Sequence, residues 1–219
     1  MFNEILPLLT SSLWETCYMV AISSLLATLL GIPLGVILTV TDKGHILENK
    51  PINQVLGNIV NATRSVPFII LMVAIIPITR IIAGTSIGTT AAIVPLTISA
   101  TPFIARIIEG SLKEVQHGVI EAAQAMGATP FQIITKVLLP EGMPSIILGL
   151  TLAVVSLINF SAMAGAIGGG GLGDLAIRYG YQRFRMDIMI VTVVVLIVMV
   201  QIVQSFGDNL SKKFNKNKL

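Results

Sequence analysis

Residues 121–140 read EAAQAMGATPFQIITKVLLP, and this stretch is the most informative part of the chain. It lies in the longest polar interval between apolar segments, so it is expected to lie in water. Its first six residues favour a short helix, and Gly127 supplies the left-handed residue that ends one. Thr129, Pro130 and Gln132 then predict a second helix start, because they provide a hydroxyl cap, a proline at the first helical position and the glutamine of a capping box. The stretch therefore predicts a rigid helix–glycine–helix element on which a soluble partner could push.

The composition places this element beside a membrane. Hydrophobic residues make up 54% of the 219 residues, charged residues only 11%, and the mean hydropathy is +0.88, which excludes an ordinary soluble domain. The long uncharged intervals are 16–41, 65–79, 81–105, 142–173 and 188–207. Four of them provide the roughly 20 apolar residues that a crossing needs, and the second does so when it extends back through Arg64 towards Val55. The sequence predicts an all-α integral membrane protein with five transmembrane helices.

The distribution of basic residues predicts the orientation. No Lys or Arg precedes Lys43, and the N-terminus carries Glu4 and Glu15, so the N-terminus is expected outside and a cleaved signal peptide is not expected. The basic residues expected inside are Lys43, Lys50, Arg106, Lys113, Lys136, Lys212, Lys213, Lys216 and Lys218. Those expected outside are Arg80, Arg178, Arg183 and Arg185, near an aromatic belt of Trp14, Tyr18, Tyr179 and Tyr181. The last three arginines could contact an external binding protein or lipid headgroups.

One domain accounts for nearly the whole chain. The sequence predicts an external segment over 1–12, a transmembrane domain over 13–208 with a cytoplasmic loop at about 106–141, and a cytoplasmic tail over 209–219. Cys17 is the single cysteine, so no intrachain disulfide can form.

Glycine and proline recur inside the apolar segments, and two interpretations stay open. Such residues allow close helix packing in membranes, and they also allow kinked helices to line a path that opens and closes. The residues concerned are Gly31, Pro33, Gly35, Pro67, Pro77, Pro95 and Pro102.

The run Gly168–Gly173 formally matches the dinucleotide fingerprint G-x-G-x-x-G. That interpretation is rejected because no strand precedes the run, and five glycines in six residues instead let the backbone leave a helix and turn. Just before it, Met163 is a lone long side chain among the small residues Ser161, Ala162, Ala164 and Gly165. Packing and a flexible gate are both compatible with this methionine.

The sequence shows no motif for catalysis, metal binding or ATP hydrolysis. His45 and His117 have no further ligand at metal spacing, and no arrangement of a catalytic triad can be argued. The acidic residues lie in loops and at segment ends. No Gly-Lys dipeptide occurs, so there is no Walker A loop, and any ATPase must be a separate subunit. The net charge of +3 follows from the inward lysines and needs no nucleic-acid partner.

The stretch at 121–140 resembles the EAA signature of the membrane subunits of bacterial ABC importers, with a conservative Val137 at the usual isoleucine. Further segments resemble methionine ABC transporter permeases, and the similarity extends over about 13–208. These segments are Arg64–Ile70, Gly84–Gly88, Ala92–Thr97, Pro102–Arg106, Ala125–Pro130 and Ser161–Met163 with the following glycines.

This resemblance implies a type I ABC importer transmembrane domain in the bacterial inner membrane, working by alternating access. The implied partners are a second copy of the chain, two ATPase subunits that hold ATP and Mg, membrane lipid, and an external methionine-binding lipoprotein. No cofactor is expected in this chain. The residues expected to couple to the ATPase are Glu121, Ala122, Ala123, Gly127, Ala128 and Pro140, and those expected on the translocation path are Asn159, Ser161 and Met163.

The resemblance implies that this chain forms the translocation path for methionine, of either the D or the L form. Other functions remain as alternatives. Another amino acid or a small peptide would suit the same architecture and is the alternative substrate. An ion-coupled secondary transporter would need intramembrane ionisable groups or an inverted repeat, and neither is visible in the sequence. A channel or scaffold would not need a capped helix pair on its cytoplasmic face.

Overall fold

The computed structural model describes residues 2–215, and every regular element in that range is helical. The α-helices are α1 (Phe2–Val40), α2 (Lys50–Ser65), α3 (Phe68–Ala74), α4 (Ile76–Ala83), α5 (Thr89–Lys113), α6 (His117–Ala125), α7 (Pro130–Ile133), α8 (Leu139–Ala164), α9 (Gly171–Leu175) and α10 (Met186–Phe214). Wider π-helical turns occupy Ile134–Leu138, Gly165–Gly169 and Ala176–Tyr181. The predicted all-α class is confirmed, while Lys216 and Lys218 of the predicted tail lie outside the described residues.

Within the described residues, four helical stretches are long and apolar enough to cross a membrane. They are Ile5–Val40, Thr89–Lys113, Pro130–Gly169 and Met186–Phe214. The interrupted pair α2 and α3 makes a fifth span when the two helices are counted together, which matches the predicted number.

The second predicted span, from about Val55 to Thr79, is interrupted twice. The helix stops at Ser65, and Pro67 adopts an extended conformation with φ −56° and ψ 136° before α3 begins. A proline has no N–H to donate and disfavours helical geometry in the residue before it, which here is Val66. A second break at Ile75 separates α3 from α4, and Pro77 lies in the first turn of α4. By contrast, Pro33, Pro95 and Pro102 lie inside continuous helices.

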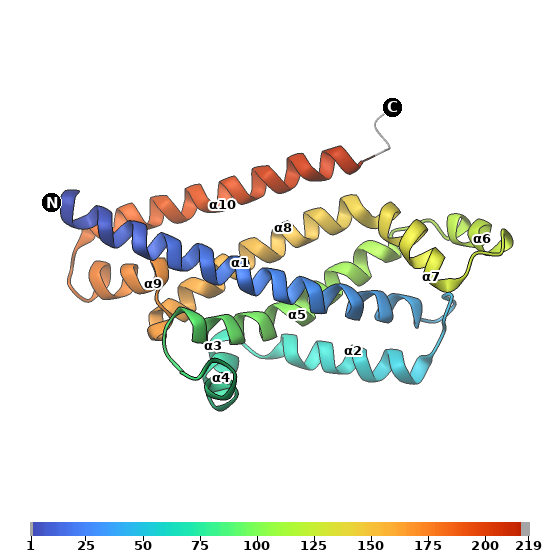
Figure 1. Ribbon diagram of the computed structural model, residues 1–219, viewed down its shortest axis with the longest axis horizontal. Coiled ribbons are helices and arrows are strands. Elements are labelled where there is room, and N and C mark those ends of the chain that lie inside the picture. Colours follow the sequence, from blue (N-terminus) through green and yellow to red (C-terminus); the bar gives the residue numbers. More distant parts are fainter. Residues whose placement is uncertain (1, 216–219) are drawn as a thin grey trace. The chain divides into compact units, whose positions relative to one another are not determined.

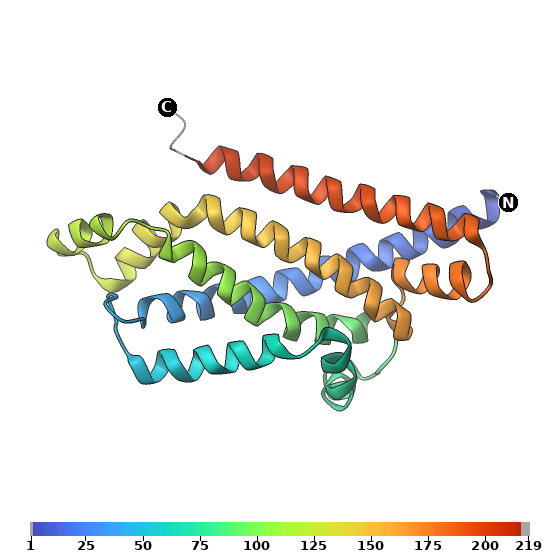
Figure 2. The same ribbon diagram turned by 180° about the vertical axis from the view of Figure 1, so that it is seen from behind.

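The chain divides into two compact units, and each is described by itself. The first unit comprises Met1–Ala27, Val66–Ala100 and Ala153–Gln204. Its core contains Ile5 of α1, Leu172 and Leu175 of α9 and Ile188 of α10, so α9 lies beside the first turns of α1 and α10 in both views (Figure 1, Figure 2). The Phe68 ring of α3 also stacks on the Phe160 ring of α8, with centroids 4.8 Å apart.

The second unit comprises Thr28–Ser65, Thr101–Leu152 and Ser205–Leu219. Gly31 and Gly35 allow α1 to approach α5 closely, because an added Cβ at Gly35 would lie only 2.5 Å from the Ala105 carbonyl oxygen. Leu38, Val60 and Ala105 form the core between α1, α2 and α5. These two glycines therefore serve close helix packing, and they do not interrupt α1.

Candidate functional site

The element at 121–140 folds as the sequence predicts. Helix α6 ends in a Schellman motif, in which the Ala128 N–H donates to the Ala123 carbonyl oxygen at 3.1 Å and the Gly127 N–H donates to that of Gln124 at 2.9 Å. Gly127 has a φ of +79°, in the left-handed region that glycine adopts without steric cost. These hydrogen bonds satisfy two carbonyl groups at the end of α6 that have no partner within the helix, so the end of α6 is fixed in position.

A capping box starts the next helix. The Thr129 N–H donates to Gln132 Oε1 at 2.9 Å, and the Gln132 N–H donates to Thr129 Oγ1 at 3.4 Å, with Pro130 at the start of α7. Helix α7 continues through the π-helical turn Ile134–Leu138 into α8. Pro140 lies in the first turn of α8 and has no N–H to donate, which accounts for the widened turn just before it. Three predicted features, the glycine break, the cap and the proline start, are confirmed.

The predicted coupling residues differ in exposure. Glu121 and Ala122 are exposed on α6, whereas Ala123 is buried together with Ile120 on the opposite face. Gly127 is exposed, and Ala128 and Pro140 are half-buried. Ala123 thus packs α6 against the rest of the second unit, and Glu121 and Ala122 form the surface that another molecule could contact.

Two further residues on this surface were not predicted. Met126 is 81% exposed and Phe131 is 74% exposed, on either side of the Gly127 turn. Large apolar side chains placed this way in a polar interval are typical of a protein–protein contact. Neither residue belongs to the glycine break or the capping box, so those motifs do not predict them, although their apolar character is visible in the sequence.

His45, in the turn between α1 and α2, lies near His117 at the start of α6, and both belong to the second unit. The His45 and His117 rings are 6.4 Å apart between centroids. Burial, and then the nearby His117, lowers the pKa of His45 below its usual value. A hydrogen bond from Lys113 and another from the Lys43 backbone N–H lower the pKa of Asp42. Both shifts favour the neutral histidine and the ionised aspartate at neutral pH.

The predicted path residues lie near the end of α8 in the first unit. Asn159 and Met163 are four residues apart on one helix face, and both are exposed, Met163 to 45%. Ser161 is buried elsewhere on the helix, and its hydroxyl donates to the Ile158 carbonyl oxygen at 2.7 Å. The structure therefore brings Asn159 and Met163 together on an open face and leaves Ser161 apart from them.

The glycine run turns the chain as predicted. Gly168, Gly170 and Gly171 have φ values of +97°, +79° and +77°, and Ile167 also leaves helical geometry. Two side chains of α1 accept hydrogen bonds from the start of α9. The Gly171 N–H donates to Glu15 Oε2 at 2.7 Å, and the Leu172 N–H donates to Thr16 Oγ1 at 2.8 Å. The role of Glu15 was missed, since these partners are 156 residues apart in the chain.

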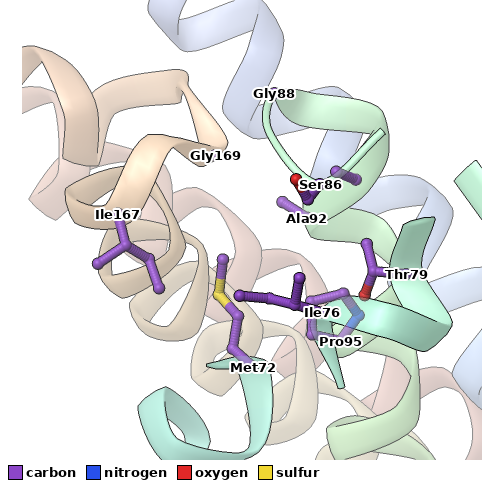
Figure 3. A pocket seen from close by; sticks show the side chains of 10 residues that line it. Met72, Ile76, Thr79, Ser86, Gly88, Ala92, Pro95, Ile167 and Gly169 are labelled. Carbon is purple, nitrogen blue, oxygen red and sulfur yellow. The ribbon is translucent and has the colours of Figure 1, made fainter. Parts of the chain in front are cut away.

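A small cavity lies against this turn, as Figure 3 shows. Its volume is about 40 Å³, and α3, α4, the loop before α5, α5 itself and the glycine turn all line it. Met72, Ile76 and Thr79 lie on one side, and Ile167 lies across from them (Figure 3). The buried Thr79 hydroxyl has no hydrogen-bond partner among the described residues. A space of this size holds a few water molecules at most, so it does not enclose an amino acid.

Comparison with known proteins assigns the chain to a family of transport components. A family model described as "Binding-protein-dependent transport system inner membrane component" matches residues 31–216. The chain is 61% identical over 206 residues to the probable D-methionine transport system permease protein MetI of Vibrio cholerae, covering 94% of this chain and 92% of the relative. It is 48% identical over 165 residues to the D-methionine transport system permease protein MetI of Escherichia coli, covering 75% of this chain and 76% of that relative.

Solved structures agree with this assignment. A chain from inward-facing conformations of the MetNI methionine ABC transporter is similar with a TM-score of 0.97 and 44% identity, covering 99% of this chain and 100% of that chain. A chain of an amino acid ABC transporter solved with histidines has a TM-score of 0.79 at 21% identity, covering 97% of this chain and 96% of that one, and supports the fold alone.

Proposed function

The chain belongs to the family of binding-protein-dependent transport system inner membrane components, and we propose that it is the membrane permease subunit of an ATP-driven methionine importer. As a member of this family it is a multi-pass protein of the inner membrane and a transport subunit, not an enzyme. Methionine is the proposed substrate because relatives matched over nearly their full length carry that assignment, and one structural neighbour is part of a methionine ABC transporter.

The observation that carries the proposal is the α6–Gly127–α7 element. The Schellman motif fixes its turn on one side, and the capping box fixes it on the other. Because the turn is rigid, a displacement of α6 also displaces α7 and α8. The exposed Glu121, Ala122, Met126 and Phe131 provide the contact surface for an ATPase subunit. ATP and Mg would be bound by that subunit.

The path itself is proposed to form between two copies of the chain. In a single copy, Asn159 and Met163 lie on an open face, and the small cavity beside the glycine turn is too small for an amino acid. A second copy that faces the first across Met163 would close the path between them. The unbranched thioether of methionine repacks with little strain, which suits a constriction that opens and closes in alternating access.

The proposed orientation has the N-terminus outside and the α6–α7 element in the cytoplasm. Two ATPase subunits bind on the cytoplasmic side, and a methionine-binding lipoprotein delivers substrate from outside. This orientation is supported by the lysines that flank the α6–α7 element and by the predicted aromatic belt. In a Cys17→Ser background, single cysteines at the exposed Glu114 and Tyr181 should react with an impermeant thiol reagent from opposite sides of the membrane. Reaction of both from outside would contradict this orientation.

The experiment that tests the function is reconstitution of the chain with the ATPase encoded beside it and uptake of labelled methionine into vesicles. The proposal predicts uptake that requires ATP, is inhibited by excess unlabelled methionine of one hand or both, and is insensitive to ionophores. Inhibition by a different amino acid or a small peptide, with none by methionine, would favour the alternative substrate. Uptake that follows an ion gradient without ATP would indicate a secondary transporter.

A further inference from the structure

A buried carboxylate near the end of α5 has no role in the function proposed above. Glu109 is only 7% exposed, and two cations of the same helix flank it. Its Oε2 accepts from Arg106 Nη1 at 2.5 Å, and its Oε1 accepts from Lys113 Nζ at 2.9 Å. We call Arg106, Glu109 and Lys113 the Glu109 cluster. An ionised carboxylate in a buried position needs such partners, and here both of its oxygens are used.

Each cation of the cluster also reaches another element of the second unit. Arg106 Nη2 donates to the Gly57 carbonyl oxygen at 3.1 Å and to Asn61 Oδ1 at 2.9 Å, both on α2. Lys113 Nζ lies 2.6 Å from Asp42 Oδ2 in the turn between α1 and α2. Glu109 is thus the shared partner of two cations that hold α2 and the α1–α2 turn.

The α1–α2 turn is tied to α2 independently. Asn53 Nδ2 of α2 donates to the Leu38 carbonyl oxygen at 2.6 Å and to Thr41 Oγ1 at 3.2 Å. The end of α1, the turn, α2 and the last two turns of α5 are therefore joined by polar contacts at several points. Charge-assisted bonds of this kind resist sliding more than apolar contacts do, because they fix direction as well as distance.

The position of the cluster connects it to the coupling element. Lys113 is the last residue of α5, and only three residues separate it from His117, the first residue of α6. His117 also lies beside His45 of the α1–α2 turn. A displacement of α6 consequently acts first on the end of α5 that carries the cluster.

We propose that the Glu109 cluster makes α2 and the α1–α2 turn follow the movement of α6, so that Glu109 is a positioning residue for the coupling of ATP hydrolysis to transport. This inference rests on the proposed function. With the cluster intact, displacement of α6 moves these elements as one body. Without the Glu109 charge, Arg106 and Lys113 lose the anion that they share and are held less firmly against α2 and the α1–α2 turn. Hydrolysis then proceeds while the path moves less.

The test is the ratio of ATP hydrolysed to methionine imported, measured in vesicles with the complete complex. Glu109→Gln keeps the shape of the side chain and removes its charge. We expect its uptake to fall about 2- to 30-fold, the range of mutations along coupling networks, while hydrolysis stays near the wild-type rate. Glu114→Gln is the matched control, because Glu114 is exposed just after Lys113 and takes no part in the cluster. Its ratio should equal that of the wild type.

Arg106→Lys provides a second variant that keeps both charges. A lysine can pair with Glu109 but lacks the planar fork that reaches Gly57 and Asn61 together, so it should raise the ratio less than Glu109→Gln does. An unchanged ratio in both variants, or equal losses of hydrolysis and uptake, would overturn the inference. If Glu109→Gln fails to assemble, the ratio of Arg106→Lys decides. A wild-type complex without ATP-dependent uptake would instead refute the proposed function.

Discussion

Replacing Gly127 by valine is expected to uncouple the permease while leaving it in the membrane. An added Cβ at this position meets no heavy atom within 4 Å, so the substitution causes no clash with the rest of the chain. The cost comes from the backbone alone, because φ is +79° and a left-handed conformation costs an L-residue about 1–2 kcal/mol. That cost lowers the equilibrium constant for closing the Schellman turn by a factor of about 5–30.

The assay is ATP-dependent uptake in reconstituted vesicles, together with the amount of ATPase retained when the complex is purified through the permease. Gly127→Val should reduce uptake by up to the same factor, with normal amounts of permease in the membrane. Gly127→Asn is the control, because asparagine adopts left-handed geometry more readily and should keep most of the activity. Wild-type uptake by Gly127→Val would refute the argument that the fixed turn passes force to α8.

The remaining predictions concern packing, the path and pH. Gly35→Ala should lower the free energy of unfolding of the purified chain by about 1–3 kcal/mol, because the added methyl group overpacks against α5. Gly110→Ala is the control, because its Cβ meets no heavy atom within 4 Å. Equal melting temperatures of the two variants would contradict this prediction. Cysteines at position 163 in two copies, in the Cys17→Ser background, should crosslink in the nucleotide-free state and much less with ATP bound, and negligible crosslinking in every state would assign Met163 to ordinary packing. Because folding lowers the pKa of His45, the unfolded chain binds a proton at this histidine more tightly than the folded chain does. Protonation therefore does not reduce the free energy of unfolding above about pH 6.5, and it reduces that free energy increasingly as the pH falls from there through the folded pKa. The melting temperature should therefore fall between pH 7 and 5 by less in His45→Gln than in the wild type, and an identical decrease in both would refute this.

Local chemistry explains what the sequence could predict. The turn at Gly127 and the cap at Thr129 depend on residues within six positions of one another, so their geometry follows from residue type alone. The glycine turn at 168–171 is predictable for the same reason. Membrane segments were predicted from hydropathy because the lipid requires long apolar helices.

The features that were missed depend on tertiary contacts. Pro67 breaks a helix while Pro33, Pro95 and Pro102 do not, and the sequence cannot separate them because neighbouring helices can stabilise a kink. Glu15 was read as a charge that orients the N-terminus, but its carboxylate accepts the Gly171 N–H from the far end of the chain. Glu109 was grouped with acidic residues at segment ends, and only the fold shows that it is buried and paired with two cations.

An ATPase subunit is proposed to drive this chain through the α6–Gly127–α7 element. The most direct measurement places a photoactivatable crosslinker on a single cysteine at the exposed Met126, in the Cys17→Ser background, in membranes that contain the whole complex. We expect a crosslinked product with the ATPase subunit whose yield changes when ATP is added, and none from a cysteine at Tyr181. Crosslinks from Met126 to lipid or to an external protein, with none to the ATPase, would contradict it.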